Sequence, residues 1–340
     1  EFHAGEPTRL FDEYGVAGFE LCLLERKSGM LKLEIERVRE ALQRGATHFF
    51  GRSLFGSYGA AIAGKPSLLE RHLPLKGGEL AIATDLFQQP SFRGLIVISR
   101  ALAQWYERRF PQLKGRIHVV PDAADPPTEG SAAFEFVGME GASFRVGYAG
   151  HLYPGKGAET IVALAERMPW VGFHVLGGYE KDVAYWQNQT AHLRNIVFYG
   201  FRPQRDVSSF LRGLDVVLAP YQRQVTVHGG GEASAWMSPL KIFESMAHAK
   251  PIVSSDLPVL REVLTHEHNA LLCDPDDLDA WVASIERLRA DHGVASALAR
   301  TANAEFLGNH SWKRRAQRII AMLVDDQSTA RFRRRTASLD

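Results

Sequence analysis

Residues 238–256 read SPLKIFESMAHAKPIVSSD, and this stretch decides the fold class. Serine is a favourable N-cap and proline suits the first helical position, so the sequence predicts a helix over 239–247. The apolar run at 252–254 predicts a short buried strand soon after it. A helix that leads into a buried strand is the repeating unit of a parallel sheet covered by helices.

The same alternation extends in both directions along the chain. Short β-rich apolar runs alternate with amphipathic segments and no internal repeat is visible, which is typical of the α/β class. From residue 144 on, we expect strands at 144–148, 172–176, 196–199, 216–219, 252–254 and 270–273, and helices at 158–167, 183–191, 206–211, 239–247, 258–264 and 278–291. Before it, we expect strands near 20–24, 47–50, 67–70, 95–98 and 117–120, and helices near 31–43 and 100–110.

A run of prolines and small polar residues, PDAADPPTEGS at 121–131, interrupts this pattern and marks a domain boundary. The sequence therefore predicts an N-terminal domain over 1–125, a linker over 126–143, a second domain over 144–312 and a C-terminal segment over 313–340. Ligands of doubly wound sheets bind at the carboxyl ends of the strands. We therefore expect the turns after the first four strands of the second domain to converge on one site.

Composition excludes several classes of protein. With 340 residues and 45% hydrophobic content, the chain can bury the cores of two domains, so a small disulfide-stapled scaffold is excluded. Cys22 and Cys273 lie far apart in apolar runs, and we expect both to be reduced core residues without a redox or metal role. No apolar run approaches the ~18 residues of a membrane span, which favours a soluble, cytoplasmic protein.

The net charge of +1 is unevenly distributed. From Lys313 onward, eight Lys or Arg residues stand against three Asp residues. Two interpretations of this basic tail remain open: a solvated chain end, or a peripheral contact with the anionic inner face of a membrane. Nucleic acid is not an expected partner, because only Phe332 interrupts the basic run with an aromatic ring and no binding module precedes it.

The start of the helix at 239 has the properties of a phosphate site. The first N–H groups of a helix have no partner within the helix and lie at the positive end of its dipole. Leu240 and Lys241 follow Ser238 here, and Lys241 adds a cation. Glu244 lies three residues further, on the same helix face. An ordinary exposed helix start has the same features and remains the alternative.

A glycine-rich loop, GYAGHLYPGKG at 147–157, lies between an expected strand and an expected helix. Glycines allow the backbone to approach a ligand closely, and Lys156 adds a mobile cation. The spacing matches neither the Walker lysine loop nor the dinucleotide fingerprint, which argues against an ATPase or a nicotinamide enzyme. A solvated lysine in a tight turn remains the alternative.

Together, four motifs resemble the retaining glycosyltransferases of family four, which share the two-domain GT-B fold. That family carries a GRLxxxKG loop, and this chain has GHLYPGKG at 150–157. The other matches are NIVFYGF at 195–201, LDVVLAP at 214–220 and the block at 238–256, which places the chain near the Ser-Pro-Leu-Lys subgroup. The resemblance covers nearly all of 144–323 and, more weakly, the first half.

This resemblance implies an α/β fold of two Rossmann-like domains with a cleft between them. The first domain would lie on the acceptor side, the second would bind the nucleotide sugar, and a helix beginning at Ser311 would cross back onto the first. The implied activity is retaining, metal-independent transfer of a hexose from a nucleoside-diphosphate sugar to a hydroxyl acceptor (a glycan, a lipid-linked acceptor or a small molecule), with no cofactor. A non-catalytic nucleotide-sugar-binding scaffold and a sugar-nucleotide epimerase remain alternatives.

Residue roles are carried over from the family only where the motifs match. Lys156 would neutralise the diphosphate, Glu244 would accept hydrogen bonds from the ribose hydroxyls, and the backbone at 200–202 would hold the base. His72 would lie beside the donor sugar, and Arg52 is a candidate acceptor contact. The implied catalytic residues are His72, Lys156 and Glu244, and the implied donor-binding residues are Gly150, His151, Lys156, Gly200, Phe201, Arg202, Ser238, Leu240, Lys241 and Glu244.

Three departures from the family pattern bear on these roles. His151 replaces the arginine of the family loop, so one diphosphate contact lacks a permanent cation. Trp236 stands where the paired-glutamate form of the motif has its other glutamate, a change that the Ser-Pro-Leu-Lys subgroup generally shows. The first domain is short, because an opening strand and glycine loop before residue 20 are hard to place.

Overall fold

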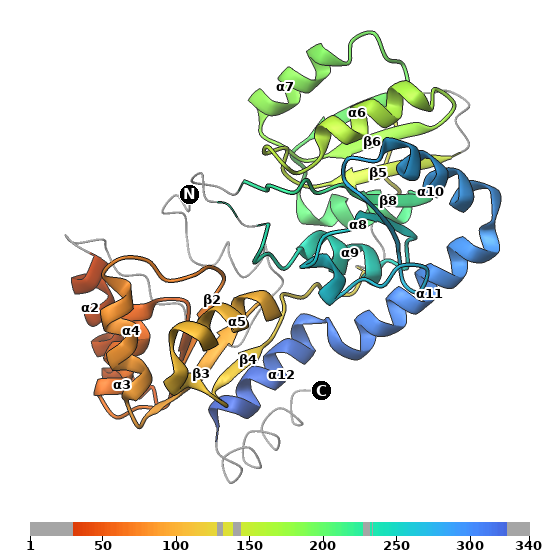
Figure 1. Ribbon diagram of the computed structural model, residues 1–340. Helices are drawn as coiled ribbons and strands as arrows, with labels where there is room; N and C mark the ends of the chain where they lie inside the picture. Colours follow the sequence, from red (N-terminus) through yellow and green to blue (C-terminus); the bar gives the residue numbers. More distant parts are fainter. Residues whose placement is uncertain (1–29, 128–131, 139–143, 227–231, 233, 325–340) are drawn as a thin grey trace.

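The computed structural model describes residues 30–127, 132–138, 144–226, 232 and 234–324. Within these residues the chain forms two parallel sheets, each with its own helices, in two adjoining domains (Figure 1). The strand expected at 20–24 lies outside the described residues. In the described part of the chain, no helix is both long enough and apolar enough to cross a membrane.

The first domain contains a four-stranded parallel sheet in the order β1-β2-β3-β4. Its strands are β1 (Phe49–Gly51), β2 (Ser67–Arg71), β3 (Phe92–Val97) and β4 (Ile117–Val119). Its helices are α2 (Met30–Gln43), α3 (Leu54–Ile62), α4 (Glu79–Gln88) and α5 (Arg100–Arg109), followed by the 3-10 turn η1 (Pro111–Leu113).

The second domain contains a six-stranded parallel sheet in the order β10-β9-β8-β5-β6-β7, so the strand order reverses between β5 and β8. Its strands are β5 (Arg145–Ala149), β6 (Gly172–Leu176), β7 (Ile196–Gly200), β8 (Val216–Ala219), β9 (Ile252–Ser255) and β10 (Leu271–Cys273). Its helices are α6 (Ala158–Arg167), α7 (Glu180–Gln189), α8 (Gln204–Arg212), α9 (Leu240–Ala247), α10 (Leu278–Ala290) and α11 (His292–Asn309), with a 3-10 turn η2 (Leu260–Glu262).

The strands predicted within the described residues are present, with ends displaced by a few residues. The sequence does not predict α3, because two glycines lower its helix propensity, although the Ser53 side chain caps its start. It does not predict α4 either. The predicted helix over 258–264 is wrong, since only the short turn η2 forms there. The N–H of Thr265 instead donates to the Asn269 side chain at 2.8 Å, in a turn that leads to β10.

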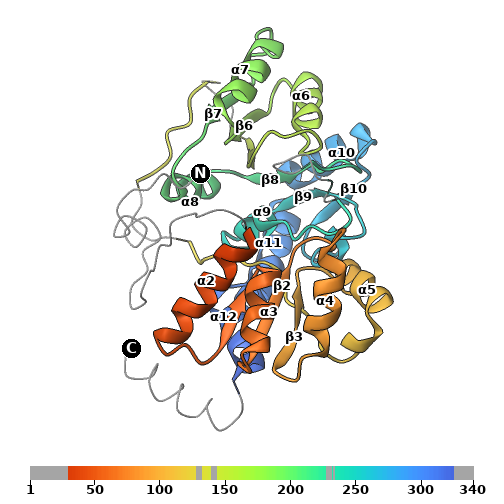
Figure 2. The same ribbon diagram turned by 90° about the vertical axis from the view of Figure 1, so that its left-hand side faces the viewer.

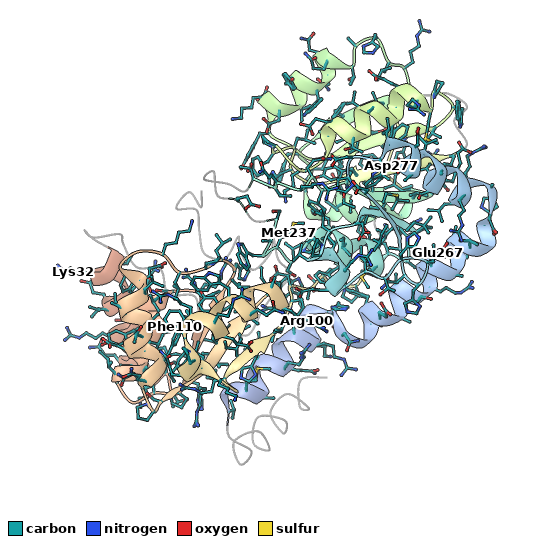
Figure 3. The ribbon with its side chains drawn as sticks, viewed as in Figure 1. Lys32, Arg100, Phe110, Met237, Glu267 and Asp277 are labelled. Carbon is teal, nitrogen blue, oxygen red and sulfur yellow. The ribbon has the colours of Figure 1, made fainter. Side chains whose placement is uncertain are left out.

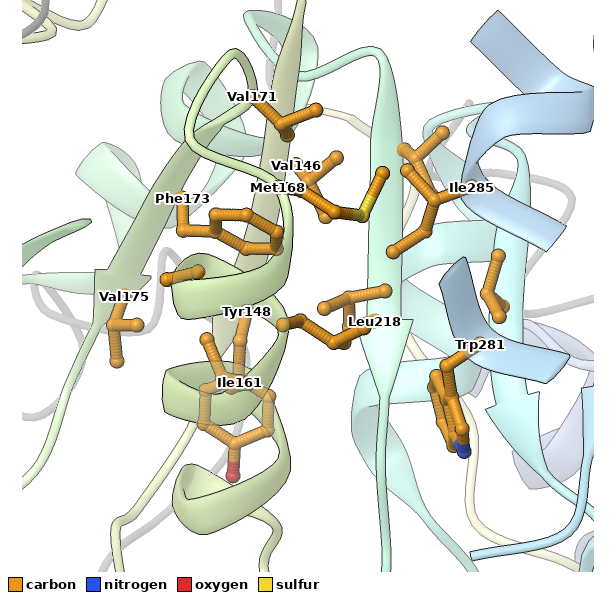
Figure 4. Packing of buried hydrophobic residues seen from close by; sticks show 14 of the residues in the cluster. Val146, Tyr148, Ile161, Met168, Val171, Phe173, Val175, Leu218, Trp281 and Ile285 are labelled. Carbon is orange, nitrogen blue, oxygen red and sulfur yellow. The ribbon is translucent and has the colours of Figure 1, made fainter. Parts of the chain in front are cut away.

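Each sheet has its own hydrophobic core, and the core of the second domain holds the strands that end at the site. Val146, Tyr148 and Phe173, from β5 and β6, are buried against Met168 at the end of α6 and against Trp281 of α10 (Figure 4). Close packing of this kind is rigid. The loops at the carboxyl ends of β5 and β6 therefore start from fixed positions.

The last described helix, α12 (Trp312–Leu323), returns to the first domain, as the family resemblance implies. It starts at Ser311, whose Oγ accepts a hydrogen bond from the N–H of Arg314. Figures 1 and 2 both show α12 lying along the first domain. Ile319 and Leu323 are buried there in one cluster with Leu68 of β2. The expected crossing helix is confirmed.

Polar contacts and one tryptophan join the two domains. The Glu262 carboxylate accepts hydrogen bonds from the N–H groups of Arg100 (2.6 Å) and Ala101 (3.1 Å) at the start of α5, and Figure 3 shows Arg100 at this junction. Trp236 packs against the core of the first domain, and its carbonyl accepts a hydrogen bond from Ser99 Oγ. The tryptophan at this departure from the family pattern therefore helps to hold the domains together.

Candidate functional site

The loops at the carboxyl ends of neighbouring strands in the second domain are hydrogen-bonded to one another. The N–H of Gly150, after β5, donates to the carbonyl of Leu176 at the end of β6 (2.8 Å). The N–H of Gly177, after β6, donates to Gly200 at the end of β7 (2.8 Å). The convergence expected from the strand order is therefore present, and it brings Gly150 and Gly200 into one row.

The glycines of the loop after β5 are needed for its packing against the segment after β8. Gly155 and Gly157 both have positive φ values, +84° and +89°. A Cβ atom on Gly155 would lie 1.9 Å from the carbonyl oxygen of Gln224, and one on Gly157 would lie 1.9 Å from that of Pro220. The glycine-rich sequence suggests a close approach to a ligand, but at these two positions the structure shows a close approach of backbone to backbone.

This packing brings together the charged residues that the sequence singles out. Lys156 Nζ lies 5.0 Å from the centre of the Tyr221 ring. Burial lowers the pKa of Lys156, and the nearby positive charge of Lys241 lowers it further. Lys241 Nζ in turn lies 2.9 Å from Glu244 Oε2, within α9. Among the described residues, Lys156 has no acidic partner, so the cluster has two cations and one carboxylate.

The start of α9 differs from the sequence prediction in one respect. Ser238 does not cap the helix, and the N-cap position is Pro239, which makes no side-chain cap hydrogen bond. Ser238 Oγ instead accepts a hydrogen bond from the N–H of Asp122 in the first domain (2.8 Å). Within the described part of the chain, the N–H groups of Leu240 and Lys241 have no hydrogen-bond partner. They remain available to an anion.

The region expected to hold the base lies at the end of β7. Phe201 is 78% exposed, and Gly200 has a positive φ of 69°. The side chain of Arg202 lines a cavity of about 490 Å³, together with Tyr199 and residues of the linker. On the neighbouring loop, the exposed ring of His151 stacks on Tyr153 at 4.9 Å between ring centres. Exposed flat surfaces of this kind suit a nucleobase.

His72 lies after β2 of the first domain, and its contacts lead to the start of α9. Its Nε2 is 2.6 Å from Glu70 Oε1. A side-chain oxygen of Asp122 lies within 4.8 Å of both His72 and Glu70. Because the N–H of Asp122 donates to Ser238, Asp122 joins His72 and Glu70 to the start of α9. The charge of Arg52, after β1, also acts on Asp122, so Arg52 belongs to this neighbourhood.

Sequence reasoning missed several residues of this site. Tyr221 and Glu70 lie beside predicted residues, but nothing in their local pattern marks them. Asp122 stands in the PDAAD segment, whose prolines and small residues mark a domain boundary. Arg315 of α12 donates to Glu70 Oε2 at 2.8 Å from the far end of the chain, which no local signal could reveal.

Comparison with known proteins finds similarity to glycosyltransferases over part of the sequence and to solved structures over most of the fold. Residues 143–291, less than half of the chain, match the sequence family described as glycosyl transferases group 1. No curated protein sequence matches the chain significantly. Among solved structures, HepE from Anabaena in complex with UDP and glucose is similar, with a TM-score of 0.66 and 19% identity over 95% of this chain and 90% of HepE.

Two further solved structures are similar to this one. A glycosyltransferase from Rickettsia africae gives a TM-score of 0.70 with 12% identity, covering 94% of this chain and 87% of that one. Sucrose-phosphate synthase from Thermosynechococcus elongatus gives 0.61 with 16% identity, covering 91% of this chain and 79% of that one. These likenesses show the fold, which is the expected α/β arrangement of two Rossmann-like domains known as GT-B.

Proposed function

We propose that this GT-B chain is a retaining glycosyltransferase that moves a hexose from a nucleoside-diphosphate sugar to a hydroxyl acceptor. Two observations carry the proposal: the N–H groups at the start of α9 are unpartnered, and the positive charge of Lys241, which lies at that start, acts on Lys156. Two ammonium groups held near each other in a partly buried place repel, and a diphosphate would compensate both. The match of residues 143–291 to glycosyl transferases supports the same conclusion.

The proposed chemistry needs stabilisation of charge more than covalent machinery. As the bond between the sugar and the diphosphate breaks and a bond to the acceptor oxygen forms, the diphosphate gains negative charge. Lys156 and the N–H groups of Leu240 and Lys241 are fixed before this happens and can stabilise it without reorganising. His151 lies on the same loop as Lys156 and is a further candidate contact.

Glu244 is proposed to hold the ribose. It lies one helical turn beyond the free N–H groups of α9, and its partly buried carboxylate can accept hydrogen bonds from two hydroxyls. We propose that the base lies against the row formed by Gly150 and the segment from Gly200 to Arg202. UDP bound to HepE shows that a related fold takes a nucleotide of this kind.

Replacing Glu244 by glutamine is expected to weaken donor binding by about 1–3 kcal/mol, the range for hydrogen bonds to a charged group. The isosteric change keeps the helix and its buried face, so the fold should be intact. Calorimetric titration with the donor measures the effect, and Glu180→Gln, an exposed glutamate at the start of α7, is the control. A donor affinity equal to that of wild type would show that Glu244 only pairs with Lys241 and does not hold the ribose.

Activity is expected to survive removal of divalent ions, because Lys156 and the start of α9 supply the positive charge. Among the described residues, Glu70, His72 and Asp122 could be grouped as metal ligands. Both oxygens of Glu70 are already used, however, by His72 and by the guanidinium of Arg315, which disfavours a cation there. Turnover measured in EDTA tests this, and complete loss with full recovery on adding Mg²⁺ or Mn²⁺ would contradict it.

The proposed activity itself is tested by release of free nucleoside diphosphate. A panel of UDP- and GDP-sugars would first be screened for thermal stabilisation of the protein, and the stabilising donors would then be assayed for turnover. Donor binding without turnover with every acceptor tested would favour the non-catalytic alternative, and interconversion of the donor sugar would favour an epimerase.

For the location, we propose a cytoplasmic protein with a peripheral membrane contact through the basic tail. Residues 325–340 of this tail lie outside the described residues.

A further inference from the structure

The segment that leads into α9 is anchored in the cores of both domains. Trp236 packs against the hydrophobic core of the first domain, and the next residue, Met237, packs against that of the second. Leu240, the first residue of α9, follows three residues later. The chain therefore crosses from one core to the other directly before this helix, and the contacts that hold the crossing also hold the helix start.

Two hydrogen bonds from the first domain hold the same segment. Ser99 Oγ donates to the carbonyl of Trp236 (3.1 Å), and the N–H of Asp122 donates to Ser238 Oγ (2.8 Å). The hydroxyl of Ser99, a residue that is 1% exposed, also accepts from the N–H of Leu102 and so caps α5. A hydroxyl can donate and accept at the same time, so the two bonds of Ser99 form together. Ser99 thus joins the start of α5 to the segment before α9.

The start of α9 has no side-chain cap of its own. Pro239 occupies the N-cap position and makes no side-chain hydrogen bond to the helix. The N–H groups of Leu240 and Lys241, which are proposed to bind the diphosphate, follow it directly. Because no cap fixes them locally, their position depends on the contacts of residues 236–238. The Trp236 ring, the Trp236 carbonyl and Ser238 Oγ all make these contacts with the first domain.

We propose that Ser99 and Trp236 position the diphosphate-binding start of α9 from the side of the first domain. This inference rests on the proposed function, in which the second domain makes every contact to the diphosphate. Ser99 is buried and therefore acts on the ligand only through the segment before α9. Without its hydrogen bond, that segment would take up further positions. The apparent affinity for a diphosphate would then fall with the fraction of the protein that keeps the competent position.

The role of Ser99 is tested against a second serine that caps a helix of the same domain. Ser53 Oγ accepts from the N–H of Gly56 at the start of α3, as Ser99 Oγ accepts from that of Leu102, but Ser99 donates in addition to Trp236. In Ser99→Ala, the dissociation constant for UDP or GDP, whichever wild type binds, is expected to rise about 5-fold, the factor that one hydrogen bond contributes to an equilibrium. Ser53→Ala should bind as wild type does, and Ser99→Thr, which keeps the hydroxyl, should restore most of the affinity.

Steady-state kinetics separate positioning from damage to the fold. A saturating donor should draw the segment of Ser99→Ala back into its competent position. We therefore expect the KM for the sugar nucleotide to rise about 5-fold and kcat to stay at the wild-type value. A general loss of folded protein would instead lower kcat at an unchanged KM.

Trp236→Ala tests the same role without altering any side chain of the first domain. It removes the ring that packs against the core of that domain, so the affinity for the same diphosphate should fall about 5-fold or more. Trp170→Ala is the matched control, because it removes a tryptophan that is 53% exposed on the second domain, and it should bind as wild type does. If Ser99→Ala does not fold, the two tryptophan variants provide the test.

Equal affinities of Ser99→Ala and wild type for the free diphosphate would overturn the role of Ser99, and the same result for Trp236→Ala would overturn that of Trp236. An equal loss in Ser53→Ala would overturn it too, because the effect would then come from a weakened first domain. A wild-type protein that binds no nucleoside diphosphate would instead overturn the proposed function.

Discussion

Replacing Lys156 by alanine is expected to lower turnover by about 100-fold or more, the scale for losing one preorganised electrostatic contact to a developing charge. The ammonium is partly buried over the Tyr221 ring, and Lys241 is close enough to lower its pKa. Water screens such a charge less than an exposed one, so its interaction with a diphosphate is strong. Because the charge on the diphosphate grows as the sugar departs, turnover should suffer more than donor binding.

The measurement is steady-state release of nucleoside diphosphate, with kcat and KM determined separately. Lys181→Ala, which removes an exposed lysine from α7 of the same domain, is the control and should retain wild-type turnover. Removing Lys156 also relieves its repulsion of Lys241, so the variant should be at least as resistant to heat as wild type. A fully folded Lys156→Ala protein with unchanged kcat would show that the diphosphate lies elsewhere.

The residues of this charged cluster could be predicted because local signals and strand order agree. Each of the two loops follows a recognisable strand and precedes a recognisable helix, and parallel topology places their ends at one edge. Lys156 lies in the loop after β5, and Lys241 lies on α9, the helix that comes after β8. The sequence predicts only that the turns after these strands converge on one site, and the observed strand order adds that β5 and β8 are neighbours.

Ser238 shows that a local sequence pattern does not determine a side chain's partner. Serine followed by proline favours a cap, yet its hydroxyl accepts from Asp122, 116 residues earlier in the chain. A cap contributes only about 1 kcal/mol, so a tertiary partner can replace it. Gly155 is a second example. Its sequence context suggests a close approach to a ligand, but the atom closest to the position of a Cβ there is the carbonyl oxygen of Gln224.

The sequence predicts less of the first domain, because the contacts that define it join distant parts of the chain. Helix α3 contains Gly56 and Gly59, which weaken its local signal, and Gly59 faces Val38 of α2. Glu70 and Arg315, 245 residues apart, are each unremarkable in sequence and acquire their role only when α12 crosses back. Pairings over such separations have no local pattern.

Replacing Arg315 by methionine is expected to lower the free energy of unfolding by about 3–5 kcal/mol, the cost of leaving one partner of a buried ion pair without the other. The two side chains are only 8% and 6% exposed. The loss would leave Glu70 as a buried carboxylate held by His72 alone, and it would remove the donor to Pro121. Denaturant unfolding measures the change, and Arg314→Met, exposed on the same helix, should stay within about 0.5 kcal/mol of wild type.

Two further measurements separate the ion pair from simple packing. Replacing both partners, Arg315→Met with Glu70→Leu, should recover part of the stability, because no unpaired charge is then left in the interior. The pH dependence has a definite sign: the folded-state pKa of Glu70 is lowered from 4.5, so its stabilisation is present above that pH and is lost as the pH falls through the lowered value. Wild-type stability should therefore decline more steeply below pH 4.5 than that of the double variant, and parallel pH profiles would show that folding does not lower the pKa of Glu70.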